Sequence, residues 1–234
     1  MHRTIEPAIH YWGTPVVLVS TLNDDATTNV APMSSAWWLG WSCMLGLDAS
    51  SCTVHNLRVR RECVLNLAGP DNAPAVNALA RTTGTAQVPL HKELLGYRHV
   101  ADKAGHAGLS LDPSQAVSPP RVRECPVQLE ARVVDIRSFG GSDPRMAVAA
   151  CCVEVQIVRV HAHPAIVAGR DRIDADAWQP LLMSFRRLFA RGGSVSGDRL
   201  YHGDEALYAP WKPGWDPATM LPAEGDETDR EEHV

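Results

Sequence analysis

Two short polar stretches hold the residues whose types and spacing best suit ligand binding. The first runs from Asn29 to Trp38 and reads Asn-Val-Ala-Pro-Met-Ser-Ser-Ala-Trp-Trp. Proline rarely sits inside a strand, so Pro32 marks an edge, a bulge or a place where pairing stops. The small residues after it leave backbone groups accessible to a flat ligand. A strand that crosses a barrel rim with exposed serines would have the same composition, so both interpretations stay open.

The second stretch runs from Asp48 to Asn56, from the end of a strand into the start of a helix. Ser50 and Ser51 supply hydroxyls beside the free backbone N–H groups of a helix N-terminus, which together suit a phosphate. Simple N-capping of the helix by these serines is the alternative interpretation.

The usual signatures of protein-based catalysis are missing. The sequence has no Gly-x-Ser-x-Gly, no P-loop, no His-Glu-x-x-His and no Gly-x-Gly-x-x-Gly between a strand and a helix. His161 and His163 share a strand face that suits a metal, but no acidic or cysteine cluster accompanies them, and a solvated strand end is favoured. His55 lies in the helix beside the proposed phosphate site. These absences favour chemistry carried by a bound cofactor, or no chemistry.

Composition narrows the class of protein. A chain of 234 residues with 45% hydrophobic residues suits a single domain with its own core, and a net charge of −5 argues against nucleic-acid binding. No apolar run reaches membrane-spanning length, and the N-terminus lacks the apolar core of a signal peptide. The six cysteines form no Cys-x-x-Cys pair, which favours reduced, buried thiols. We therefore expect a cytoplasmic protein.

The first third of the chain predicts short strands and two helices. The ranges are strands over 15–21, 28–38 and 43–47, a helix over 52–60, a strand over 62–67 and a helix over 71–81. The Trp37-Trp38-Leu39-Gly40-Trp41 cluster is expected to fill the core, with a special substrate pocket as the alternative.

Residues 84–124 are rich in glycine and proline and predict mostly loop with one short helix. Two long strands follow, with apolar residues alternating over 127–133 and 153–157. Both runs slip phase, at Val133-Val134 and at Ile157-Val158, which predicts a bulge in each strand. Long antiparallel strands that bend in this way suit a small barrel.

One mainly β domain with a few helices therefore fits residues 1–210. The remaining residues, 211–234, are rich in proline, glycine and acidic side chains, and we expect a flexible acidic C-terminal tail.

Four sequence blocks resemble the opening of the flavin reductase-like, FMN-binding split-barrel family. They are Tyr11 to Thr21, Asn29 to Ser35, Ser50 to Thr53 and Cys63 to Leu67, and their order and spacing match. The turn Asp24-Asp25-Ala26-Thr27 departs from the family in having no glycine. The resemblance implies an antiparallel split β-barrel of Greek-key type, with non-covalent FMN in a groove at a homodimer interface.

The family's functional positions can be carried over residue by residue. Asn29 and the strand Pro32, Met33, Ser34, Ser35 and Ala36 would line the isoalloxazine, and Ser50, Ser51 and Thr53 would hold the phosphate. The remaining positions are Asn66 near the pocket, the loop Thr82, Thr83 and Gly84 over the flavin, Lys92 toward the phosphate or ribityl chain, and Phe185 or Phe189 against the ring. No residue is expected to be catalytic.

The resemblance implies an NAD(P)H-dependent flavin reductase that supplies reduced flavin to a partner monooxygenase. Hydride transfer from NADH or NADPH needs stacking geometry and hydrogen-bond donors rather than a protein nucleophile. Two alternatives stay open: a non-enzymatic, flavoredoxin-like FMN electron carrier, and a split barrel used for another ligand such as haem.

Overall fold

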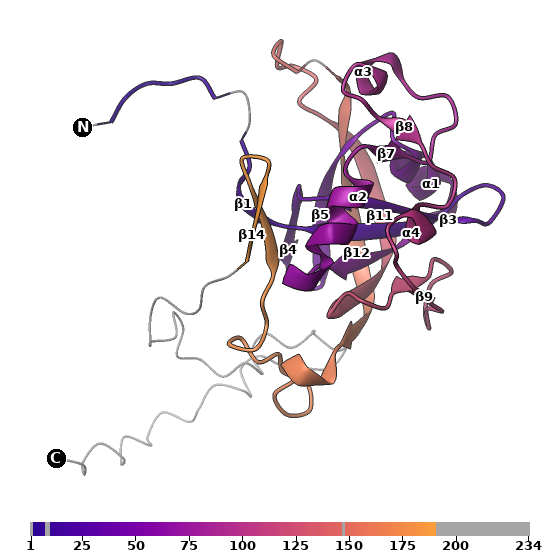
Figure 1. Cartoon of the computed structure of the whole chain (residues 1–234), viewed down its shortest axis with the longest axis vertical. Coiled ribbons are helices and arrows are strands. Elements are labelled where there is room, and N and C mark those ends of the chain that lie inside the picture. The colour runs from indigo at the N-terminus through magenta and orange to yellow at the C-terminus, as the bar shows by residue number, and fades with distance from the viewer. Residues whose placement is uncertain (1, 8–9, 147, 191–234) are drawn as a thin grey trace. The chain divides into compact units, whose positions relative to one another are not determined.

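A computed structural model describes residues 2–7, 10–146 and 148–190 of the chain. The tail expected over 211–234 lies outside the described residues. Seven antiparallel strands form the main sheet, in the order β3-β2-β6-β11-β12-β5-β4. Figure 1 labels β3, β4, β5, β11 and β12 of this sheet. Their bounds are β2 (Val17–Leu22), β3 (Thr28–Met33), β4 (Ala36–Leu39), β5 (Ser42–Asp48), β6 (Glu62–Leu67), β11 (Val127–Phe139) and β12 (Ala150–Ala162). The mainly β, antiparallel class predicted from the sequence is confirmed.

The smaller elements surround this sheet. A three-stranded sheet contains β1 (Trp12–Pro15), β13 (Leu181–Ser184) and β14 (Arg187–Ala190). Two short pairs are β7 (Thr82–Thr83) with β8 (Arg98–His99), and β9 (Leu111–Asp112) with β10 (Arg121–Val122). The helices are α1 (Cys52–Arg60), α2 (Ala73–Leu79), α3 (Leu90–Glu93) and α4 (Lys103–His106), with 3-10 turns η1 (Pro70–Asn72) and η2 (Pro164–Ile166).

The sheet must curl, because its two edge strands are consecutive in the chain. Only Ser34 and Ser35 separate β3, at one edge, from β4, at the other. Three Cα–Cα steps span at most about 11 Å, so the two edges lie close together without being paired. An antiparallel sheet closed in this incomplete way is an open, split barrel.

Several predicted elements match the structure, and others need correction. The helix over 52–60 and the strand over 62–67 are confirmed. The single strand over 28–38 is wrong, because the chain changes sheet edge at Ser34-Ser35. The helix over 71–81 is shorter, since η1 precedes α2 and α2 ends at Leu79. Two short helices, α3 and α4, stand where one was expected.

Both predicted bulges are confirmed in the β11–β12 ladder. Glu130 pairs with Arg159 while Ala131 pairs with Ile157, so Val158 is the extra residue on β12. On β11 the extra residue is Val134, between pairs formed by its two neighbours. Each bulge bends its strand, which lets the long hairpin wrap around the barrel.

The apolar residues form two clusters on opposite faces of the sheet. Val17 and Val19 of β2 point into the barrel interior, and Val16 and Leu18 point toward a second cluster that α2 and α4 share. Both faces of this strand are therefore buried, which explains its unbroken apolar run. The cysteines are all free. No helix in the described ranges is long and apolar enough to cross a membrane.

The expectation that the tryptophan cluster fills the core is wrong for most of its members. Side chains alternate along the edge strand β4, so Ala36 is buried while Trp37 is 57% and Leu39 is 77% exposed. Trp41, in the following turn, is 42% exposed, and only Trp38 packs against the core. An edge strand exposes one face and its backbone, which turns these residues into an apolar surface.

A buried carboxylate fastens the loop over 113–119 to the barrel. Glu130 of β11 is wholly buried and accepts hydrogen bonds from the backbone N–H groups of Gln115 (2.9 Å), Ala116 (2.5 Å) and Val117 (3.2 Å). His161 Nε2 lies 2.6 Å from the same carboxylate. Burial raises the pKa of Glu130, but these hydrogen bonds outweigh it and the net direction is downward.

The two strand-end histidines therefore have structural contacts. His161 is not a solvated strand end, since its side chain is only 18% exposed and bonds Glu130. His163 caps η2 by accepting the Ala165 N–H at 3.2 Å. Among the described residues, no group of three or more His, Cys, Asp or Glu is placed to hold a metal.

We expect Glu130→Gln to lower the free energy of unfolding by about 2–3 kcal/mol at pH 7, because an amide N–H₂ would replace an oxygen that accepts backbone hydrogen bonds. The contribution of Glu130 to the free energy of unfolding should be present above the unfolded-state pKa of about 4.3, and it should fade as acid protonates the native carboxylate. Urea denaturation measures both. Glu154→Gln is the control, since Glu154 pairs with Arg137 at a more exposed site and should lose less than about 1 kcal/mol. Equal losses of unfolding free energy in the two variants would contradict the role of Glu130 in fastening the loop over 113–119.

Candidate active site

A cavity of about 730 Å³ opens where the split in the barrel meets its surrounding elements. Its wall is formed by the end of β3, the Ser34-Ser35 link, the N-terminus of α1, residues 76–84 and the β13–β14 hairpin. This volume lies within the range of small-molecule and cofactor sites.

Nine of the thirteen site residues predicted from the sequence line this cavity. They are Asn29, Pro32, Met33, Ser34, Ser35, Ser51, Thr53, Thr83 and Lys92. The structure thus brings together two stretches that are separate in sequence, and their role toward a cofactor stays a prediction.

Four predicted residues do not line the cavity. Ala36 is buried in the barrel core. Ser50 turns back on the preceding strand, where its Oγ donates to the Asp48 carboxylate at 2.6 Å. Phe185 packs edge to face on Trp12, with ring centroids 4.4 Å apart.

The fourth, Asn66, is wholly buried in the sheet. Its amide N–H₂ donates to the Leu18 carbonyl at 2.8 Å and to Ser20 Oγ at 2.9 Å. Its carbonyl accepts the Val122 N–H at 2.8 Å. With these partners Asn66 joins β2, β6 and β10, a structural task that a sequence pattern cannot distinguish from a ligand contact.

The N-terminus of α1 faces the cavity with backbone donors. Ser51 is the N-cap and its Oγ accepts the Val54 N–H at 3.2 Å. The first intrahelical donor is the His55 N–H, which bonds the Ser51 carbonyl at 3.1 Å. The N–H groups of Cys52 and Thr53 come before it and remain available to an anion. Asn56 holds the helix in place by donating to Thr21 Oγ1 at 3.0 Å and to Asn23 Oδ1 at 2.9 Å.

Two lysines reach the same region. Lys92 Nζ lies 3.3 Å from Asp48, so its charge is already paired. Lys103 is 2% exposed and lines the cavity, and its ammonium has no hydrogen bond or ion pair within the described part of the chain. The pKa of Lys103 is lowered to about 8, chiefly by burial; Cys52 opposes this effect, and Lys92 adds a smaller lowering.

Sequence reasoning missed Lys103. It is the first residue of α4, in the aperiodic region after residue 84, and α4 packs against β3. No local pattern signals that this lysine is buried. A buried cation without a partner is costly, and an anionic ligand in the cavity would compensate it.

An unpaired acceptor lies on the same cavity. The Asn29 amide N–H₂ donates to Thr53 Oγ1 at 3.1 Å and to Thr21 Oγ1 at 3.3 Å, while its Oδ1 is buried without a partner. Gly84 approaches closely, since a Cβ there would lie 2.8 Å from Asn29 Oδ1 and 2.9 Å from Cys52 Sγ. A Cβ at this position would require the Asn29 or Cys52 side chain to move.

The cavity is positively charged although the chain carries a net charge of −5. Its described lining contains the cationic side chains of Arg81, Lys92, Lys103 and Arg186, against the carboxylate of Asp48. Hydrogen bonds from Ser50 and His91 together with Lys92 outweigh burial and hold the pKa of Asp48 at about 2. A cavity with this balance attracts anionic ligands.

Residues 9–190 match the flavin reductase like domain, and the chain belongs to that family of flavin-binding oxidoreductases. The uncharacterized protein YdfE of Bacillus subtilis (strain 168) is 37% identical over 193 residues, which cover 82% of this chain and 91% of that protein.

Solved structures show the same split-barrel fold. Flavoredoxin of Desulfovibrio vulgaris (Miyazaki F) matches with a TM-score of 0.67 and 16% identity, over 84% of this chain and 96% of that one. Nitrilotriacetate monooxygenase component B from Bacillus cereus matches with a TM-score of 0.63 and 18% identity, over 79% and 87%. At these identities the likeness concerns the fold.

We expect this cavity to bind a phosphorylated ligand, with FMN as the probe, more weakly as the pH rises from 7 to 9, because Lys103 loses its proton near pH 8 and can no longer pair with a phosphate. Lys103→Met should raise the Kd of FMN about tenfold at pH 7 and flatten this pH dependence. The same variant should stabilise the ligand-free protein by about 1–3 kcal/mol, since it removes a buried, unpaired charge.

Fluorescence titration gives the Kd values, and urea denaturation gives the stability. Riboflavin, which lacks the phosphate, is the control and should bind with the same affinity across this pH range and in both proteins. A Lys103→Met variant that binds FMN as tightly as the parent would contradict this assignment.

Proposed function

We propose that this protein binds FMN in the cavity and reduces it with NADH or NADPH. The observation that carries the proposal is Lys103, a buried cation with no partner in the described chain, beside the free N–H groups at the start of α1. A phosphate monoester satisfies both at once. The family relationship supports a flavin as the molecule that bears this phosphate.

The residues present fit FMN. Lys103, Lys92, Ser51, Thr53 and the first turn of α1 would hold the phosphate. Asn29, whose amide N–H₂ donates to Thr53 Oγ1 at 3.1 Å, would help to position that hydroxyl.

The ring itself needs an open, flat wall. The strand end and link from Pro32 to Ser35 supply small side chains and backbone groups along one side of the cavity. When bound, FMN would supply the redox chemistry, accepting a hydride from the nicotinamide and a proton from solvent to give the two-electron reduced flavin and NAD(P)⁺.

The protein's own residues then position and stabilise rather than react. Burial raises the pKa of the cavity-lining Cys52, so this thiol stays protonated near neutral pH and is a poor nucleophile. Its Sγ donates to Asn23 Oδ1 at 3.2 Å, which is a structural contact. Orientation of two flat rings against the cavity wall is the remaining contribution.

A partner and a location follow as part of the proposal. Nitrilotriacetate monooxygenase component B, one of the proteins with this fold, supports a flavin-dependent monooxygenase as the consumer of the reduced flavin. Six free cysteines, four of them buried, suit the reducing cytoplasm.

We also propose a homodimer. Trp37, Leu39 and Trp41 form an exposed apolar surface at the edge strand β4. This strand directly follows Ser34-Ser35, the link that lines the cavity. Monomeric proteins seldom expose such a surface together with an unpaired strand edge. A second copy of the chain would cover it and lie next to the cavity.

The absorbance spectrum tests the main proposal. Purified protein should bind FMN with visible flavin bands, and these should bleach under anaerobic conditions when NADH or NADPH is added. A heat-denatured sample with the same FMN is the control. Bound flavin that stays oxidised would favour a carrier that receives electrons from another protein, and colourless protein or a haem-like spectrum would overturn the proposal.

The dimer has its own prediction. Trp37→Asp should shift the solution mass from twice 25.5 kDa toward 25.5 kDa, because a charge would be buried in the interface. Light scattering after size exclusion measures this shift. Val59→Asp is the control, since Val59 is similarly exposed but lies on α1. A parent protein that is already monomeric would contradict the proposal.

A further inference from the structure

The turn between β13 and β14 has a backbone that its residues do not favour. Ser184 pairs with Arg187, so Phe185 and Arg186 form a two-residue hairpin loop. Their φ angles are 45° and 70°, both in the left-handed region. A loop of this type favours Asn-Gly or Gly-Gly, because an ordinary side chain is strained there. Strained backbone that persists points to a functional requirement for the side chains involved.

The two side chains of this turn have different surroundings. Phe185 stacks edge to face on Trp12 outside the cavity, whereas Arg186 lines the cavity itself. The described residues offer the Arg186 guanidinium no hydrogen bond and no ion pair. The strained turn therefore presents an unpaired cation at the cavity.

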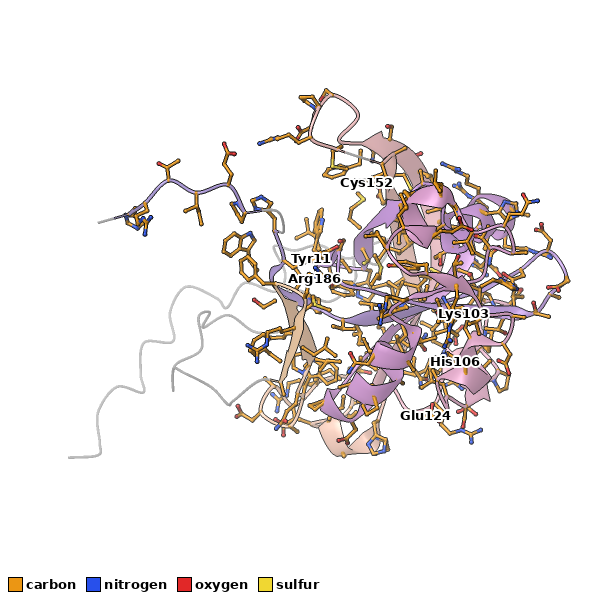
Figure 2. The ribbon with its side chains drawn as sticks, turned by 45° about the horizontal axis from the view of Figure 1, so that its top comes forward. Tyr11, Lys103, His106, Glu124, Cys152 and Arg186 are labelled. Carbon is orange, nitrogen blue, oxygen red and sulfur yellow. The ribbon has the colours of Figure 1, made fainter. Side chains whose placement is uncertain are left out.

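The turn is fastened to the cavity wall. The Phe185 N–H donates to the Tyr11 carbonyl at 2.9 Å, and the Tyr11 hydroxyl lies 3.1 Å from Ser35 Oγ on the link between β3 and β4. Figure 2 shows Arg186 next to Tyr11, with Lys103 well separated from both. Besides Arg81, the cavity thus has one cationic group at Lys92 and Lys103, and a second at Arg186.

A single FMN phosphate can neutralise only one of these two cationic groups. Lys92 and Lys103 are buried and lie near the helix N–H groups at the start of α1, which makes this group the better phosphate site. Arg186 is then left for a second anion that enters the same cavity. In a flavin reductase that molecule is the nicotinamide dinucleotide, whose pyrophosphate matches the planar fork of a guanidinium.

We propose that Arg186 binds a phosphate group of the nicotinamide dinucleotide and so determines the affinity for the electron donor. This inference rests on the proposed function. The strained turn holds the guanidinium at the cavity, and the Tyr11–Ser35 contact fixes the turn next to the β3–β4 link that would line the flavin.

The test is Arg186→Asn in the full-length protein loaded with FMN. Asparagine tolerates a left-handed backbone, so this change removes the cation and relieves the strain together. We expect the KM for the preferred dinucleotide to rise about tenfold, with kcat within about twofold of the parent. The KM of the variant should also depend less on salt than that of the parent.

A stability measurement separates a binding role from a structural one. The Tm of Arg186→Asn should stay the same or rise, whereas loss of a structural residue would lower both Tm and activity. Arg187→Asn is the matched control, because it removes the same charge from the next residue, which does not line the cavity. It should leave the KM for the dinucleotide unchanged.

Each outcome decides the proposal. An unchanged KM in Arg186→Asn, in a parent protein that reduces flavin, would overturn the role of Arg186 and leave the proposed function intact. A weaker Kd for FMN with an unchanged KM would assign Arg186 to the flavin and also overturn it. A parent protein that oxidises neither NADH nor NADPH would overturn both, and that result is visible before any variant is made.

Discussion

The two-residue link between β3 and β4 is the constraint on which the rest of the structure depends. Because Ser34 and Ser35 join the opposite edges of one sheet, the sheet has to curl but cannot close its ladder there. The link's small side chains line the cavity at this gap. The α1 N-terminus and the β13–β14 hairpin lie around this gap and turn it into a cavity. The incomplete closure of the barrel and the cavity therefore both result from the short link between β3 and β4.

Electrostatics gives the cavity its chemical character. In a chain of net negative charge, burying Lys103 without a partner lowers its pKa and costs stability, so the ligand-free protein is strained electrostatically. Asp48 does not relieve this cost, because Lys92 and His91 already bind it. A dianionic ligand would relieve it, which couples binding to stability. The same residues that weaken the empty protein are those that would make it selective for a phosphorylated flavin.

The sequence predicted the elements whose signals are local. The helix over 52–60, the following strand and both bulges of the β11–β12 hairpin depend on capping serines and on side-chain alternation, which are visible in any window of the chain. The break after Met33 was missed because strand edges are set by pairing with distant residues. Trp37 and Leu39 were assigned to the core for the same reason, since only the sheet order places β4 at an edge.

The site residues that lie in continuous sequence motifs could be predicted, whereas those that tertiary packing brings to the cavity could not. Asn29, Ser51 and Thr53 lie in continuous motifs, whereas Lys103 enters through the docking of α4 on β3 and Arg186 through a hairpin turn. Asn66 shows the converse, because a buried asparagine looks the same in sequence whether it serves a ligand or joins three strands. The signals that would have found Lys103 and Arg186 are physical rather than sequential: an unpaired buried charge and a strained backbone. Both are costs that folding alone does not explain, and both lie on one cavity.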